Sequence, residues 1–128
     1  MIFVDTNIIM YAVGGEHPLK GQARHFFEES LEGGERLATS AEVLQELVHA
    51  YLPVNRLETL DAALTLAEGR IDVFWSVEPE DVRFARALVE RYAELGARDL
   101  LHLACCKRRD VDEIKTFDRA LAAAFGRP

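Results

Sequence analysis

Short apolar runs alternate along the chain with longer stretches in which apolar residues recur every three or four positions. Such runs predict strands at residues 1–4, 36–38, 71–75 and 113–116. The helical spacing predicts helices over residues 6–13, 17–31, 39–51, 57–67, 79–95, 98–109 and 118–125. Strands that alternate with helices favour a parallel sheet covered on both faces. The fold class predicted is therefore α/β.

Helix boundaries are predicted from glycines and capping residues. Gly69 is expected to stop the helix that begins near Leu57, and Gly96 to end the long helix that starts at Pro79. Thr39 and Glu42 stand three residues apart, which fits a Thr-x-x-Glu capping box. This spacing predicts Thr39 as the N-cap of the helix that follows the second strand.

Composition fits one globular domain over residues 1–128, with 49% apolar and 29% charged residues. The chain has no apolar run of about 20 residues, the length that crosses a membrane. Asp5 interrupts the first apolar segment and no basic residue precedes it, so a secretory signal is not expected. We expect a cytoplasmic protein with no membrane partner. Cys105 and Cys106 are expected to be small buried side chains, not a disulfide.

The formal net charge is −7, which argues against a broad basic surface for nucleic acid. The charges are unevenly distributed, because residues 1–97 hold 8 Lys or Arg and 17 Asp or Glu, whereas residues 98–128 hold 7 and 5. The basic residues of the second part either contact a phosphate backbone locally or form an ordinary solvated helix face. They are Arg98, Lys107, Arg108, Arg109, Lys115, Arg119 and Arg127.

Four carboxylates stand near the positions where strands of a parallel sheet end. Asp5 follows the first predicted strand, Asp118 follows the last, Asp99 begins a late helix, and Glu46 lies on the second turn of the helix after the second strand. Each alone has a simpler explanation, as a helix cap or a solvated glutamate. Four acids at the ligand-binding edge of one sheet would repel one another, and a cation relieves that repulsion. Together they indicate a divalent-metal site.

Carboxylates without a neighbouring His or Cys favour Mg²⁺ or Mn²⁺ over Zn²⁺. A site of this kind suits phosphodiester hydrolysis. His102, one turn after Asp99, is expected to contact Asp99 or the core and to add little to an oxygen site. Core packing is also the default expectation for four aromatic residues, Phe26, Phe27, Trp75 and Tyr92.

Four segments together resemble the PIN-domain ribonucleases, and within them the VapC-type toxins of toxin–antitoxin pairs. The segments are Phe-Val-Asp5-Thr6-Asn7, Leu-Gln-Glu46-Leu, Arg-Asp99-Leu-Leu-His-Leu-Ala and Thr116-Phe-Asp118, and they span nearly the whole chain. The resemblance implies a three-layer α/β/α domain with a short central parallel sheet. It also implies Mg²⁺- or Mn²⁺-dependent cleavage of RNA, a homodimer, and a small antitoxin whose C-terminal segment blocks the site.

The resemblance implies roles for individual residues. Asp5, Glu46, Asp99 and Asp118 match the acidic quartet of the family, with Asp5 and Asp99 as direct metal ligands. Glu46 would orient water or act as a base, and Asp118 would complete the site. The side chains that would support these acids are Thr6 and Asn7 for Asp5, and Thr116 for Asp118. Because family members vary at the fourth acid, Asp112 is a weak substitute for Asp118.

Three alternatives remain open. A phospho-receiver domain has a similar length and an acidic Mg²⁺ pocket, but the third strand here ends Phe74-Trp75-Ser76, without the aspartate that accepts the phosphoryl group. A catalytically silent PIN-like module that binds RNA or protein is not excluded by any residue. A PIN nuclease that acts in RNA processing without an antitoxin also remains possible.

Overall fold

Four parallel strands form one sheet at the centre of the computed structural model, which describes residues 1–126. The strand order is β3-β2-β1-β4, with β1 at Ile2–Val4, β2 at Leu37–Ser40, β3 at Val73–Trp75 and β4 at Glu113–Lys115. The helices of the described residues are α1 (Thr6–Val13), α2 (Lys20–Glu32), α3 (Ala41–Tyr51), α4 (Leu57–Arg70), α5 (Pro79–Leu88), α6 (Ala97–Lys107) and α7 (Arg119–Phe125).

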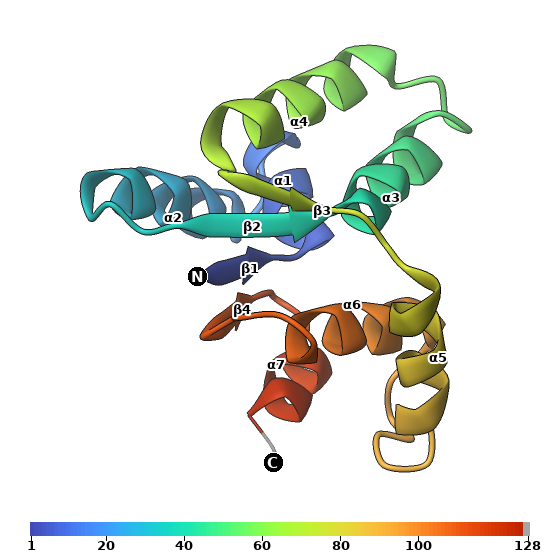
Figure 1. Ribbon diagram of the computed structural model, residues 1–128. Helices are drawn as coiled ribbons and strands as arrows, with labels where there is room; N and C mark the ends of the chain where they lie inside the picture. Colours follow the sequence, from blue (N-terminus) through green and yellow to red (C-terminus); the bar gives the residue numbers. More distant parts are fainter. Residues whose placement is uncertain (127–128) are drawn as a thin grey trace.

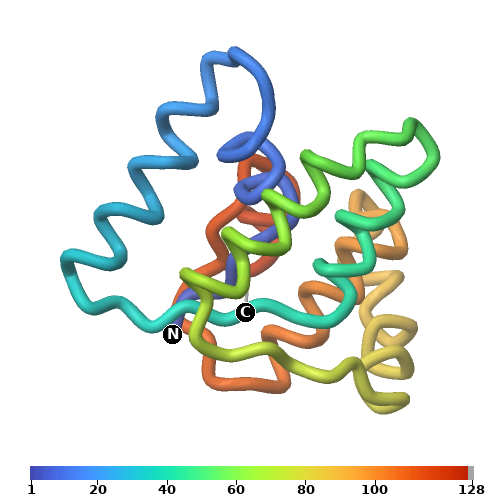
Figure 2. The backbone as a smooth tube through the Cα atoms, turned by 90° about the horizontal axis from the view of Figure 1, so that it is seen from above, coloured from blue at the N-terminus to red at the C-terminus, as the bar shows by residue number. Residues whose placement is uncertain are grey.

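The helices form two groups on either side of the sheet (Figure 1). Helix α1 contacts α2, α3 and α4, whereas α6 contacts α5 and α7. Strands β1 and β4 pair with each other, so the first and last strands lie side by side although they are far apart in the sequence (Figure 2). The predicted α/β architecture is confirmed. No helix within residues 1–126 is both long enough and apolar enough to cross a membrane.

The core is built on the first strand and the first helix. Phe3, Val4, Ile8 and Ile9 are all fully buried, because β1 lies between β2 and β4 and α1 is covered by α2, α3 and α4. Strands that are buried on both faces read as continuous apolar runs, which explains why a three-residue strand was recognisable in the sequence. Since β1 runs straight into α1, the end of this strand is fixed by the core on both sides.

The predicted capping box at Thr39 is wrong. The N-cap of α3 is Ser40, whose side chain accepts a hydrogen bond from the Val43 amide at 3.3 Å. Thr39 is still part of β2, fully buried, and its hydroxyl donates to the Val4 carbonyl at 2.8 Å. A buried threonine hydroxyl must find an acceptor, and here the neighbouring strand supplies one, so the next residue caps the helix.

Two predicted helix ends are also wrong. Gly69 lies inside α4, which continues to Arg70. Gly69 is exposed, and a glycine in a helix lowers its stability by only about 1 kcal/mol relative to alanine. Helix α5 ends at Leu88, and the segment up to residue 95 forms turns. Tyr92 and Leu95 follow α5 in this non-helical segment, and both side chains are buried. Their three-residue spacing matches that of apolar residues on one face of a helix, which explains why the sequence predicted a longer helix.

A buried aspartate fastens α5 to the end of α6. Asp81 is fully buried and accepts from Arg109 at 2.8 and 3.0 Å, from Arg108 at 2.5 Å and from the Glu78 amide at 2.8 Å. Burial raises the pKa of Asp81, but the two arginines and the amide outweigh it and hold the pKa well below its usual range. The Arg109 guanidinium also lies 5.0 Å from the centre of the Trp75 ring.

Two of the basic residues that the sequence suggested as phosphate contacts belong to this cluster. Arg108 and Arg109 are held by Asp81 and serve the fold. Arg98 and Arg119 are exposed, whereas Arg127 lies outside the described residues. The local positive charge near the sheet edge therefore depends on fewer side chains than the sequence count suggests.

Replacing Asp81 by Asn should destabilise the protein by about 3 kcal/mol, because the change leaves two arginines without their buried counter-charge. This value is the low end of the range usual for breaking a buried ion pair, because the Arg108 side chain is 35% exposed. The free energy of unfolding in urea at pH 7 measures the effect. Because the pKa of Asp81 is lowered in the folded protein, the stabilisation is complete above the unfolded pKa of about 4 and declines as pH falls below it.

Glu80→Gln is the matched control, since Glu80 is an exposed neighbour whose nearest ion-pair partner, Arg83, lies 3.8 Å away. This variant should stay within about 0.5 kcal/mol of wild type. Equal stability of both variants at pH 7 would show that the Asp81 cluster does not hold α5 and α6 together.

Candidate metal centre

A cavity of about 620 Å³ opens at the carboxyl ends of the strands and is lined by all four predicted acids. Asp5 stands directly after β1, and Asp118 stands between β4 and α7. Asp99 is in the first turn of α6, and Glu46 lies on α3. Parallel strands deliver their ends to one edge, so residues far apart in the sequence meet there. The fold thus brings the four acids to one cavity.

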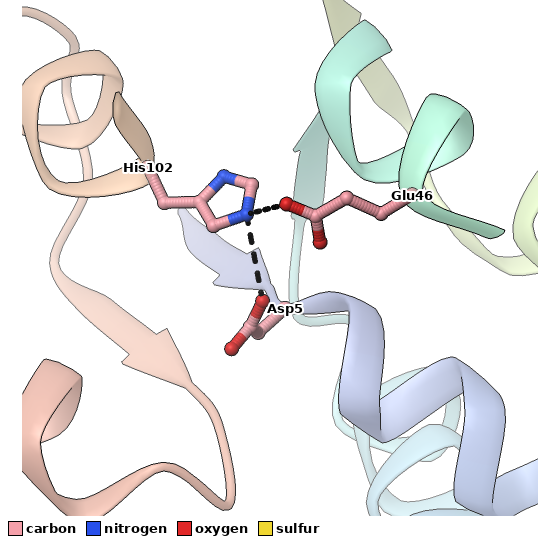
Figure 3. Close-up of side chains that lie close together, drawn as sticks. All are labelled: Asp5, Glu46 and His102. Carbon is pink, nitrogen blue, oxygen red and sulfur yellow. Dashed lines mark hydrogen bonds and ion pairs between the residues drawn. The ribbon is translucent and has the colours of Figure 1, made fainter. Parts of the chain in front are cut away.

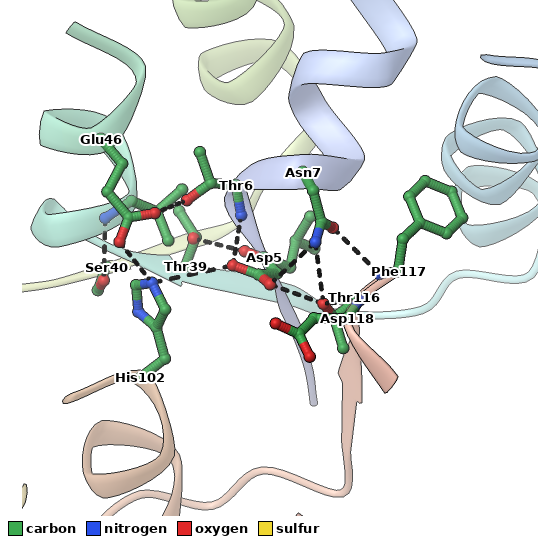
Figure 4. Close-up of polar contacts among 12 residues, drawn as sticks. Asp5, Thr6, Asn7, Thr39, Ser40, Glu46, His102, Thr116, Phe117 and Asp118 are labelled. Carbon is green, nitrogen blue, oxygen red and sulfur yellow. Dashed lines mark hydrogen bonds and ion pairs between the residues drawn. The ribbon is translucent and has the colours of Figure 1, made fainter. Parts of the chain in front are cut away.

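Asp5 is the most buried of the four, with 5% of its surface exposed. It caps α1 by accepting from the Thr6 amide at 2.7 Å, and its other oxygen accepts from the Thr116 hydroxyl at 2.7 Å and from the Asn7 amide at 3.3 Å (Figure 4). Burial raises the pKa of Asp5, although the positive charge of His102 and these hydrogen bonds partly oppose the shift. The carboxylate is therefore oriented but incompletely neutralised.

Asn7 and Thr116 link the ends of β1 and β4. The Asn7 side chain donates to the Thr116 hydroxyl at 3.2 Å and accepts from the Phe117 amide at 3.1 Å. The Thr116 hydroxyl also accepts from the Asp118 amide at 2.9 Å, while it donates to Asp5. Thr116, expected to support Asp118, therefore connects both aspartates.

Glu46 on α3 and His102 on α6 point toward each other, and both lie next to Asp5 (Figure 3). The Nε2 atom of His102 is 2.8 Å from a Glu46 oxygen and 3.8 Å from an Asp5 oxygen. The second Glu46 oxygen accepts from the Thr6 hydroxyl, so the Thr6 side chain holds Glu46 and only its amide holds Asp5. Donor atoms of Asp5, Glu46 and His102 all lie within 4.8 Å of one another.

Burial alone would raise the pKa of Glu46, but the hydrogen bond and charge of His102, together with the Thr6 hydroxyl, bring it below its ordinary value. Burial alone would lower the pKa of His102, but the hydrogen bond and charge of Glu46 and the charge of Asp5 bring it above its ordinary value. The two groups therefore favour the charged form of each other.

His102, expected to contact Asp99 or the core, lies in the core, and its Nε2 atom also contacts Glu46 and Asp5. His102 is 1% exposed, and its ring also packs on Phe3, with ring centres 5.6 Å apart. The three-residue spacing of Asp99 and His102 predicted that both side chains lie on one face of the helix. What the sequence could not give was the partner, since Glu46 comes from a different helix.

Asp99 and Asp118 form the second half of the centre. Asp118 is the N-cap of α7 and accepts from the Ala120 and Leu121 amides at 2.9 and 3.1 Å. Burial, then the charge of Asp118 and a hydrogen bond with it, then the charge of Asp5, raise the pKa of Asp99 to about 6. Asp112, the proposed substitute, lies elsewhere: its exposed carboxylate pairs with the N-terminal amine of Met1.

This donor set fits a divalent cation. Burial and then the neighbouring carboxylates raise the pKa of Asp99, and a cation relieves such crowding. Oxygen donors suit hard ions such as Mg²⁺ and Mn²⁺, and an imidazole nitrogen in the group extends the range toward transition metals. The acidic cluster can therefore bind a metal ion, and its chemistry leaves the choice among these ions open.

The sequence profile of the PIN domain matches residues 2–125. The chain therefore belongs to the PIN-domain family. It is 61% identical to Ribonuclease VapC23 of Mycobacterium tuberculosis over 125 residues, which is 98% of both chains. Ribonuclease VapC13 of the same organism is 44% identical over 119 residues, covering 93% of this chain and 91% of the relative. The chain is thus a homologue of the VapC ribonuclease toxins.

Two solved structures show the same fold. Mycobacterium tuberculosis VapC20, described as a sarcin–ricin loop cleaving toxin, covers 100% of both chains with a TM-score of 0.75 and 23% identity. VapBC2 from Rickettsia felis, bound to a DNA fragment from its promoter, has a TM-score of 0.70 and 19% identity, covering 92% of this chain and 88% of that one. At these identities the likeness concerns the fold alone.

The crowding of Asp99 and Asp118 can be measured in the metal-free protein. Carboxyl carbon NMR should give Asp99 a pKa of about 6 in wild type. In Asp118→Asn this pKa should fall toward its ordinary value, because the neighbouring charge is lost, and it should stay somewhat raised because burial remains. Asn also caps helices well, so α7 is preserved. An Asp99 pKa near 4 in wild type would contradict the crowded arrangement.

Proposed function

We propose that this chain is a metal-dependent endoribonuclease that hydrolyses RNA phosphodiester bonds as the toxin of a toxin–antitoxin pair. The observation that carries the proposal is the set of four carboxylates around one cavity, with the pKa of Asp99 raised to about 6. The 61% identity to Ribonuclease VapC23 over nearly the whole chain supports the choice of RNA as substrate.

In this proposal Asp5 and Asp99 hold Mg²⁺ or Mn²⁺. When bound, such an ion supplies Lewis-acid stabilisation of charge on a phosphate oxygen and lowers the pKa of a coordinated water. Glu46 orients the attacking water or accepts its proton, and Asp118 completes the charge of the site. Thr6, Asn7 and Thr116 act through these acids, because their hydrogen bonds fix the directions of the carboxylate oxygens.

The RNA backbone reaches the acids past Arg98 in this proposal. Arg98 is exposed, and among the described residues that line the cavity it is the only lysine or arginine. Its charge contributes to the lowered pKa of Glu46, so it lies near enough to the acids to offset their repulsion of phosphate. Selection of a particular RNA would then rest on loop shape and a few contacts, as is usual for RNA.

A small antitoxin protein that blocks the cavity and a homodimer are the partners proposed for the chain. Support comes from the VapC names of the relatives and from a VapBC assembly among the structures of the same fold. Light scattering during size exclusion should give the mass of two chains for the purified protein. A mass of one chain over a range of protein concentrations would contradict the homodimer.

Asp5→Asn should abolish cleavage, with a loss of at least about 100-fold, while the protein stays folded. Asn keeps the shape and still caps α1, but it removes the charge that binds the metal. The measurement incubates the protein with total cellular RNA in Mg²⁺, in Mn²⁺ and in EDTA, and maps the cut ends. Circular dichroism and the unfolding midpoint establish that the variant is folded.

Asp112→Asn is the matched control, because it removes a carboxylate of the same type that pairs with the N-terminal amine, away from the cavity. It should cleave as wild type does. Equal cleavage by wild type and Asp5→Asn would reduce Asp5 to a helix cap and contradict the mechanism. No cleavage by wild type on any RNA, with intact metal binding, would favour the silent binding module.

A further inference from the structure

His102 lies beside Asp5 and Glu46 in the centre, although the family resemblance gives it no role. We propose that His102 is a positioning residue that holds Glu46 in place by donating its Nε2 hydrogen to the Glu46 carboxylate. The inference rests on the proposed function, because it assigns the means by which one of the proposed catalytic acids is aimed. Three features of the structure carry it.

The first feature is that both oxygens of Glu46 are held. His102 contacts one at 2.8 Å, and the Thr6 hydroxyl donates to the other (Figure 4). A glutamate on a helix surface otherwise samples several rotamers, and holding it in one of them costs side-chain entropy. Since Thr6 and His102 come from α1 and α6, the Glu46 side chain is clamped between two elements other than its own helix.

The second feature is that the imidazole is itself fixed. His102 is 1% exposed, and its ring packs on Phe3. Phe3 is stacked on Trp75, with ring centres 5.7 Å apart and planes at 13°, and the Arg109 guanidinium lies 5.0 Å from the Trp75 ring centre. A column of four flat groups therefore runs from the Asp81 cluster to the metal centre, so the Nε2 atom has little freedom to move.

The third feature is the direction of the hydrogen bond. A carboxylate accepts only, so the nitrogen that contacts Glu46 must carry the hydrogen. Nε2 is thereby engaged as a donor and has no lone pair for a metal. The other nitrogen, Nδ1, is buried without a hydrogen-bond partner among the described residues. The geometry thus assigns His102 to the aiming of Glu46, whereas direct ligation would require the hydrogen bond to break.

The test compares His102→Phe with His102→Gln. Phe keeps a flat ring in the column but donates nothing, whereas the Gln amide places a donor at about the position of Nε2. Glu46 would hold a water on the ion and adds negative charge beside it, so releasing its carboxylate weakens metal binding. Mn²⁺ affinity, measured by the loss of the free-ion EPR signal in the absence of RNA, should therefore fall about 10- to 100-fold in His102→Phe. In His102→Gln the affinity should return to within about threefold of wild type.

Two controls separate positioning from a general structural effect. His25→Phe changes an exposed histidine on α2 that pairs with Glu29 at 3.2 Å, and this variant should bind Mn²⁺ as wild type does. The fluorescence of Trp75, the only tryptophan in the chain, reports whether the column stays packed. If His102→Phe disturbs the fluorescence or the unfolding midpoint, the result from His102→Gln decides the question.

A double-mutant cycle with Glu46→Gln tests whether His102 acts through Glu46. In the Glu46→Gln background, His102→Phe should add less than about a twofold further loss of Mn²⁺ affinity, because the two residues act as one unit. Full additivity would overturn the inference. In the cleavage assay, His102→Phe should lower kcat with KM nearly unchanged, since the RNA contacts are intact.

Two further results would overturn the inference. Nitrogen coupling in the pulsed EPR spectrum of bound Mn²⁺ that disappears in both His102 variants would make His102 a direct ligand. If both His102 variants bind Mn²⁺ with wild-type affinity, His102 has no role in metal binding at the centre. A protein that binds Mn²⁺ in a His102-dependent manner but cleaves no RNA would contradict the proposed function and leave this inference standing.

Discussion

The structure depends on one buried negative charge, the carboxylate of Asp5 at the end of the central strand. Apolar residues before and after it are fully buried, so the core fixes its position and removes most of its water. The amide of Thr6 and the side chains of Asn7 and Thr116 orient it, yet burial still raises its pKa. His102, 3.8 Å away, offsets this charge only in part, and the other acids of the centre gather around the same cavity, where a metal ion can bind.

The two helical layers contribute opposite halves of the centre. From one layer, α1 and α3 bring Thr6 and Glu46, and from the other, α6 brings Asp99 and His102. The position of α6 depends in turn on Asp81, which ties its C-terminal end to α5 through Arg108 and Arg109. The site is therefore sensitive to packing on both faces of the sheet, although every acid lies at a single edge.

The parallel sheet and the meeting of four acids could be predicted because both follow from local patterns. Buried strands appear in the sequence as short apolar runs, and the carboxyl ends of parallel strands lie at one edge of the sheet whatever the length of the loops. Three local features could not be predicted: the cap at Ser40, the helix that continues past Gly69 and the turns after Leu88. Each depends on tertiary structure, namely the strand next to Thr39, the exposure of Gly69 and the packing of the residues after Leu88. The contact of His102 with Glu46 could not be predicted for the same reason, because the two residues are 56 positions apart in the sequence.

Manganese located in a crystal tests the central claim most directly. Crystals of the wild-type protein grown with Mn²⁺ and measured near the manganese absorption edge should show anomalous density in contact with the Asp5 carboxylate, within the cavity that Asp99 and Asp118 also line. The His102 ring should keep its contact with Glu46 in the same map. Fully occupied manganese sites confined to other surfaces, with none at Asp5, would contradict the account.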